Sequence, residues 1–424
     1  MIKKHLWIIL LILSINTYAQ YKPDVIVFGG SVVGASTAIQ AARSGVKTLL
    51  ILPDETLLSN PTLSLKVPAF DLGLWKEWKE AYKLASDSAK TTPEKVLETI
   101  ISKTNNLQVI KAAIPNKIEE NKNGWEVTIP LNGKNENIKC KVIVDATSDY
   151  KSSPLNSFGI VTFDEKGKFV PLVNYSTEQK NEPYLQLQKL YRTSGAAGFG
   201  KDSSLNYIPL GVFIPQEKSN LIIVSTAALK DFSKDDFQNA ALWTNIGQAA
   251  GALAAFGPFF DTTPSKANIR LTQAEMFTYK SFLYPVLDVE VTDSAFYPIQ
   301  KIIASGLLNL DFKTGKFNPD EKVKLSDFNA VMSKIYPRSK IWFLENKKVS
   351  DLSSKDLVSL ISFTAAKDPY NVNKEISSDW ESKYHFDSSF NNDHLITKKE
   401  MTILFEVYLQ PFNINVDFNG YYLR

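Results

Sequence analysis

The stretch DVIVFGGSVVG, residues 24–34, decides the fold that we expect for this chain of 424 residues. An apolar run leads directly into a glycine-rich turn, and small residues that favour a helix follow over residues 35–44. Gly45 then closes this helix, and a second apolar run covers residues 46–52. A strand, a glycine turn, a helix and a second strand in this order open a doubly wound α/β domain.

The residue types in the turn indicate a cradle for a nucleotide pyrophosphate. Gly29 permits a tight turn, a small residue at position 31 lets the backbone approach the phosphates, and Gly34 lets helix and strand pack closely. The helix N-terminus then presents N–H groups without intrahelical acceptors to the phosphates. The sequence therefore predicts a nucleotide site at this turn.

Two features depart from the usual nucleotide-binding pattern. Ser31 replaces the second glycine, and Leu52 stands where an acid at the end of the second strand would hold the ribose hydroxyls. Asp54 or Glu55 can substitute for that acid only if the chain turns back after Pro53. A domain that has kept the fold and lost the nucleotide is the alternative.

Two later segments resemble parts of a known family. Strand-like runs at residues 107–110, 125–130 and 138–144, separated by Asn-Gly pairs, predict an inserted β-meander. The last run ends in VDATSD, residues 144–149, and IGQAAG, residues 246–251, begins a helix of very small residues. With the glycine turn, these segments resemble FAD-dependent oxidoreductases that carry an "IDATGD" strand end and close the flavin domain with "GQAAG".

The resemblance covers residue 24 to about residue 260 and implies a fold and a set of site residues. The implied fold is α/β, a Rossmann-like FAD/NAD(P)-binding domain with an inserted β-meander. Gly29, Gly30, Ser31 and Gly34 would hold the pyrophosphate, Ala146, Thr147 and Ser148 would form the second crossing, and Gly247, Gln248 and Ala250 would bring a helix N-terminus to the isoalloxazine ring. FAD rather than NAD is the implied cofactor.

Several departures from this family fall on the ligand side of the domain. Ser148 replaces a glycine, residues 58–60 lack the usual glycine pair, and no arginine lies between Arg192 and Arg270. The substrate region after residue 149 is also short. The resemblance implies hydride transfer from a small organic substrate, with a sugar derivative as one candidate, to flavin. A degenerate, non-catalytic binding or scaffold protein remains the alternative.

The C-terminal third has a different pattern, and we expect four segments: residues 1–19, 20–262, 263–283 as a linker helix, and 284–424. Helical stretches around residues 317–335 and 390–409 resemble S-layer-homology repeats and predict a small, mostly helical domain of two units. The arginine of the family's "TRAE" turn is missing from both. The resemblance therefore implies packing, or contact with a protein or a glycan.

The N-terminal segment and the composition limit the function further. Lysines before the apolar run at 6–13 and the sequence Thr17-Tyr18-Ala19 predict a signal peptide that is cleaved after Ala19, which implies a secreted or periplasmic protein. Cys140 is the single cysteine, and only His385 and His394 remain after that segment. The sequence therefore has too few Cys and His residues to favour a zinc site or a Ser-His-Asp triad. The net charge of +3 does not indicate nucleic acid.

Overall fold

The computed structural model describes residues 21–58, 70–86, 91–148, 150–175, 186–200, 204–225, 229, 239–347 and 350–423. The predicted signal peptide, residues 1–19, lies outside this part of the chain. Among the residues that the structure describes, no helix combines the length and the apolar character needed to cross a bilayer.

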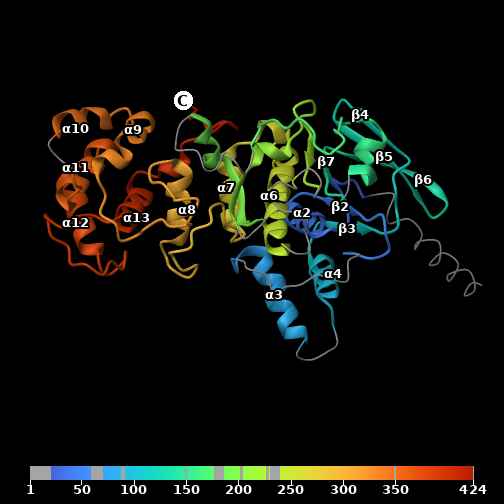
Figure 1. Ribbon diagram of the computed structural model, residues 1–424, viewed down its shortest axis with the longest axis horizontal. Helices are drawn as coiled ribbons and strands as arrows, with labels where there is room; N and C mark the ends of the chain where they lie inside the picture. The colour runs from blue at the N-terminus through green and yellow to red at the C-terminus, as the bar shows by residue number, and fades with distance from the viewer. Residues whose placement is uncertain are drawn as a thin grey trace, which may run out of the picture.

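A parallel sheet of five strands forms the centre of the larger part of the molecule (Figure 1). Its order is β10-β7-β1-β2-β3, with β1 at Val25–Phe28, β2 at Thr48–Ile51, β3 at Leu107–Ile110, β7 at Val142–Asp145 and β10 at Leu221–Ile223. β1 pairs with both β2 and β7, so the turn after β1 lies in the middle of the carboxyl edge. The expected α/β class with a parallel sheet is confirmed, but the predicted composition of the meander is wrong in part. Residues 107–110 form β3 and residues 142–144 belong to β7, so both lie in the parallel sheet.

Each face of the sheet is covered by a different layer. Val25, Val27 and Leu50 face the helices, whereas Ile26 and Phe28 face the meander, as the two-residue period of a strand requires. The helical layer contains α2 (Val32–Arg43), α3 (Gly73–Ser86), α4 (Pro93–Lys103) and α6 (Ala240–Phe259), and the meander contains β4 (Lys117–Asn121), β5 (Gly124–Leu131) and β6 (Lys134–Cys140). The Asn-Gly pair at 132–133 forms the β5–β6 hairpin turn, with both φ angles positive.

Helices α2 and α6 pack closely because α6 carries glycines at the contact. A Cβ atom on Gly247 would lie 2.5 Å from the Cβ atom of Ser36, and one on Gly251 would lie 2.5 Å from the carbonyl oxygen of Thr37. Both distances are shorter than a real contact allows. The small residues of the predicted helix therefore determine how closely the two helices approach.

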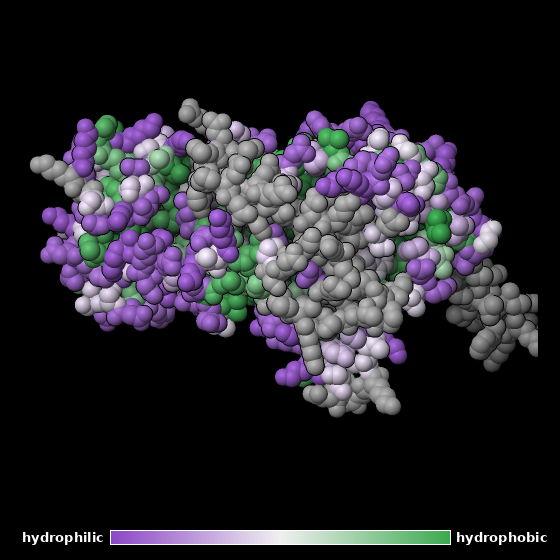
Figure 2. Space-filling model, viewed as in Figure 1, coloured by the Kyte–Doolittle hydropathy of each residue, from purple (hydrophilic) through white to green (hydrophobic). Residues whose placement is uncertain are grey.

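The remaining elements complete the fold around this sheet and extend it to one side (Figure 1). They are α5 (Pro154–Ser157), β8 (Ser194–Phe199), β9 (Leu205–Pro209), α7 (Ile269–Thr278), α8 (Phe296–Ser305), α9 (Leu325–Ile335), α10 (Ser339–Glu345), α11 (Ser354–Ala365), α12 (Pro369–Asp379) and α13 (Lys398–Tyr408), with short 3-10 turns between some of them. The surface seen over the C-terminal helices is mainly hydrophilic (Figure 2).

Helices α9, α11 and α13 begin in an equivalent way. The residues that lead into them form a closed ring of backbone hydrogen bonds, from Val323 N to Ile396 O, from Ile396 N to Leu352 O, and from Leu352 N to Val323 O, at 2.8–3.0 Å. The structure thus has three equivalent helix starts, not the two units that the sequence predicts. The middle one escaped the sequence analysis because it lacks an aromatic residue corresponding to Phe317 and Phe390.

The buried side chain of Arg270 connects the C-terminal helices to the sheet domain. The guanidinium of Arg270 donates to the carbonyl oxygens of Arg192, Ala304 and Ile414 at 2.9–3.0 Å. Burial lowers the pKa of Arg270 to about 10. Buried apolar residues from both parts also form one continuous core. The division into residues 20–262 and 284–424 stays a prediction, and α7 lies within the predicted linker.

We expect Gly251→Leu to lower the free energy of unfolding by about 1–3 kcal/mol or more, because the side chain must separate α2 from α6. Thermal unfolding followed by circular dichroism measures the change. Gly133→Asn is the matched control, since a Cβ atom at Gly133 meets nothing within 4 Å and asparagine tolerates its positive φ of +78° better than most residues. A stability of Gly251→Leu equal to that of this control would contradict the packing argument.

We expect Arg270→Met to destabilise the protein by about 3–5 kcal/mol, because buried carbonyl groups lose a charged donor. Calorimetry should also show the C-terminal helices unfolding ahead of the sheet domain in the variant. Arg338→Met, at an exposed arginine, serves as the control and should unfold like the parent. Identical unfolding of both variants would show that Arg270 does not couple the two parts.

Candidate functional site

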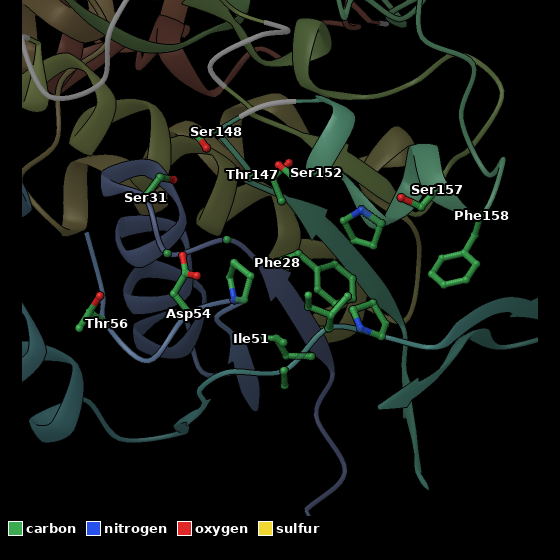
Figure 3. Close-up of a pocket in the computed structure, with 17 residues that line it drawn as sticks. Phe28, Ser31, Ile51, Asp54, Thr56, Thr147, Ser148, Ser152, Ser157 and Phe158 are labelled. Atoms are coloured by element: carbon green, nitrogen blue, oxygen red, sulfur yellow. The ribbon is translucent and has the colours of Figure 1, made fainter. Parts of the chain in front are cut away.

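A cavity of about 650 Å³ opens at the carboxyl ends of β1, β2 and β7 (Figure 3). Ligands of open parallel sheets bind at this edge, beside the central strand where the order of the strands reverses. The lining residues follow four strands: Phe28, Gly29, Gly30 and Ser31 after β1, Ile51, Pro53, Asp54 and Thr56 after β2, Ala113, Ile114 and Pro115 after β3, and Thr147, Ser148, Ser152, Pro154, Ser157 and Phe158 after β7.

Gly29 and Gly34 permit the close contact on which the shape of the turn depends. Gly29 has a φ of +121°, and a Cβ atom there would lie 2.4 Å from the carbonyl oxygen of Ala146. A Cβ atom on Gly34 would lie 2.3 Å from the carbonyl oxygen of Gly29. Any side chain at either position would therefore push the turn, α2 and the end of β7 apart.

Ser31 replaces the second glycine of the motif and has a structural role of its own. It is the N-cap of α2, where its hydroxyl oxygen accepts the N–H of Gly34 at 3.2 Å. The same hydroxyl donates to the carbonyl oxygen of Ala146 at 2.8 Å. Ser31 therefore joins the turn to β7 while it lines the cavity at the N-terminus of α2.

The acid of this site is Asp54 rather than a residue at position 52. Leu52 is 1% exposed and packs in the core on the helical face, so an acid there would be buried among apolar groups. The chain turns after Pro53, and Asp54 lines the cavity with Thr56 and Ser31 (Figure 3). This is the condition under which the sequence allows Asp54 to substitute for the missing acid.

The residues predicted to form the second crossing, 146–148, directly follow the end of β7. Thr147 and Ser148 line the cavity. Ala146 is fully buried and contributes its carbonyl oxygen to Ser31, so it supports the wall without lining it.

The third predicted segment lies elsewhere. Gly247, Gln248 and Ala250 are in the middle of α6, which begins at Ala240, so the expectation of a helix N-terminus at these residues is wrong. Gln248 donates to the side chain of Gln40 and accepts the N–H of Leu74, at 3.1 and 3.0 Å. The small residues therefore serve helix packing, because α6 starts two turns earlier than its glycines indicate.

Asp145 is a residue of the site region that the sequence analysis passed over. It ends β7, is fully buried, and accepts the backbone N–H of Thr147 at 3.1 Å and the hydroxyl of Thr147 at 2.7 Å. Its second carboxyl oxygen accepts the hydroxyl of Ser153 in a short hydrogen bond. The sequence feature that could have identified Asp145 is a single acid at the end of an otherwise apolar strand.

The lining of the cavity is mainly apolar and contains little charge. Among its lining residues, all within the described part of the chain, Asp54 is the one charged side chain, and hydroxyl groups supply most of the remaining polar atoms. A bound pyrophosphate must therefore rely on backbone N–H and hydroxyl donors. The described residues also contain no group of His, Cys, Asp and Glu that could hold a metal ion.

The residues present fit the nucleotide half of a dinucleotide. The turn that approaches β7 leaves no room for side chains, the N-terminus of α2 begins beside the cavity, and Asp54 can accept from ribose hydroxyls. These features agree with a cofactor whose phosphates lie over the glycine turn.

Comparison with solved structures gives low similarity. p-Nitrophenol 4-monooxygenase from Pseudomonas putida is 11% identical, with a TM-score of 0.24 and coverage of 34% of this chain and 44% of that one. Anhydrotetracycline hydroxylase from Streptomyces rimosus is 15% identical, with a TM-score of 0.25 and coverage of 34% and 35%. Glycerol-3-phosphate dehydrogenase from Bacillus halodurans, complexed with FAD, is 16% identical, with a TM-score of 0.22 and coverage of 30% and 35%.

The chain thus spans less than half of each of these proteins, and such low similarity says nothing about its activity. No curated protein matches its sequence. The family model described as FAD dependent oxidoreductase matches residues 24–151, which contain β1, α2, the meander and the end of β7. This match supports a redox flavoprotein and identifies FAD as its cofactor.

Proposed function

We propose that this chain is an exported FAD-dependent oxidoreductase that transfers a hydride from a small organic substrate to the flavin. The observation that carries the proposal is the cavity at the carboxyl edge of the sheet, which contains the glycine turn, the N-terminus of α2 and Asp54. The family match over residues 24–151 supports the same assignment.

The residues around the cavity suggest how the nucleotide half of FAD is held. Backbone N–H groups at residues 30–33 would bind the pyrophosphate, because those at the start of α2 have no intrahelical acceptors. The N–H groups of Gly29 and Gly34 already donate to the carbonyl oxygen of Ile51 and the hydroxyl of Ser31, so these glycines shape the turn. Asp54 would accept from the ribose hydroxyls, and Thr147 and Ser148 would border the cofactor on the β7 side. FAD, when bound, supplies an isoalloxazine ring that accepts the hydride.

The lack of cations at the cavity favours FAD binding that depends little on salt. Ion pairs with lysine or arginine are screened by salt, whereas hydrogen bonds from neutral donors are screened much less. Among the described residues that line this cavity, none is a lysine or an arginine. The site therefore differs from phosphate sites that rely on basic side chains.

A non-catalytic binding or scaffold protein on the same fold is the second candidate. The serine at 148, the leucine at 52 and the absence of an arginine between Arg192 and Arg270 favour it. The C-terminal helices would then make the contacts with a protein or a glycan. At the turn before α13, Lys398 forms an ion pair with Glu321, so this cation is already engaged inside the chain.

Titration of the apo-protein with FAD, followed by flavin fluorescence, tests the proposal. We expect saturable binding that changes little between low and high salt, and Asp54→Asn should weaken it by about tenfold or more through loss of a charged acceptor. Gly34→Leu should abolish binding because it separates α2 from the turn, and Gly133→Asn should bind as the parent does. The absence of saturable FAD binding in the parent would contradict the oxidoreductase proposal and favour the non-catalytic scaffold protein.

Export is tested independently of the cofactor. N-terminal sequencing of the secreted or periplasmic protein should begin at Gln20, because Thr17-Tyr18-Ala19 follows a short apolar run. Recovery of a chain that still begins at Met1 from a membrane fraction would contradict cleavage after Ala19.

A further inference from the structure

Asp145 interrupts an apolar row at the carboxyl edge of the sheet. Its neighbours across the strands are Phe28 on β1 and Ile223 on β10, and all three side chains are buried. A buried carboxyl group in such surroundings costs free energy unless hydrogen bonds compensate it. Burial raises the pKa of Asp145, while hydrogen bonds from Ser153 and Thr147 lower it. Among the described residues, no charged side chain contributes to this shift in pKa.

Within the described part of the chain, the side-chain hydrogen bonds of Asp145 all go to the segment that forms one wall of the cavity. Thr147 donates through its backbone and its hydroxyl, and Ser153 donates through its hydroxyl. Ser153 is also the N-cap of α5, where its oxygen accepts the N–H groups of Leu155 and Asn156 at 3.1 and 3.4 Å. Since the Ser153 oxygen accepts two N–H groups, its own proton points to Asp145.

This arrangement fixes the wall at two points. Thr147, Ser148 and Ser152 line the cavity on one side of Ser153, and Pro154, Ser157 and Phe158 line it on the other side. Leu155 anchors the short helix in the core under the meander. Asp145 itself does not line the cavity, so it acts on a ligand only through these residues.

We propose that Asp145 is a positioning residue for the cofactor: its carboxylate holds Thr147 and Ser153 so that residues 147–148 and 150–158 keep the shape that accepts the nucleotide. The inference rests on the proposed FAD site and goes beyond it, because it assigns FAD affinity to a side chain outside the cavity. The ionised carboxylate fits this role, since one oxygen accepts both donors of Thr147 and the other accepts the hydroxyl of Ser153. In Asp145→Asn, at least one donor loses its acceptor whichever way the amide is oriented.

Two measurements on Asp145→Asn and Ser153→Ala test the inference. In the apo-proteins, amide hydrogen exchange should become faster in residues 147–158 and stay unchanged elsewhere. In FAD titrations, each variant should bind about tenfold more weakly or worse. The fold-loss in FAD affinity of the double variant should be smaller than the product of the fold-losses of the two single variants, because both substitutions remove the same hydrogen bond.

Asp311→Asn is the matched control. Asp311 also accepts a threonine hydroxyl and backbone N–H groups from the turn that follows it, but that turn lies in the C-terminal part. This variant should leave both FAD affinity and exchange in residues 147–158 unchanged.

The outcomes separate this inference from the proposed function. If the parent binds FAD and both Asp145→Asn and Ser153→Ala bind it equally well, the inference is overturned and the proposed function stands. If the parent does not bind FAD, both are overturned. If exchange rises throughout the chain in both variants, Asp145 is a general stability residue and the inference is again overturned.

Discussion

The close approach between the turn after β1 and the end of β7 is the constraint on which the rest of the nucleotide domain depends. Gly29 and Gly34 leave no space for a Cβ atom, and Ser31 bonds the turn to Ala146. Because these contacts bring β1, α2 and β7 together, the cavity forms where three strand ends meet. The same contacts place the N-terminus of α2 at its edge. The parallel sheet holds the strand ends in place, and the glycine turn lets phosphate groups approach the backbone.

Around this turn the protein uses neutral polar groups in place of charges. Hydroxyl groups and backbone N–H groups lie among mainly apolar lining residues, and the one carboxylate of the described lining, on Asp54, is the proposed acceptor for ribose hydroxyls. A second carboxylate, that of Asp145, lies behind the wall and not in it. The two carboxylates differ in burial, and this explains their different roles. A buried carboxyl group needs several hydrogen-bond donors, and Asp145 receives them from Thr147 and Ser153 in the cavity wall.

The C-terminal helices are joined to this domain by a continuous core and by arginine–carbonyl hydrogen bonds. Arg270 satisfies carbonyl groups from three separate parts of the chain, so it connects the β8 region, α8 and the segment after α13. The ring of backbone hydrogen bonds around Val323, Leu352 and Ile396 then organises the three helix starts. Both arrangements depend on partners that are far apart in the sequence.

The sequence by itself determined the parallel sheet, the Asn-Gly turn of the meander, and the roles of Gly29 and Gly34. These features follow from local patterns, since strand period, turn chemistry and glycine spacing act over a few residues. Tertiary structure alone decided that Asp54 replaces Leu52 at the cavity, that Gly247 lies in the middle of α6, that three helix starts form a ring, and that Asp145 holds the wall. Each of these depends on where distant segments meet, and a side chain's neighbours across a sheet or between helices are not encoded in its own stretch of sequence.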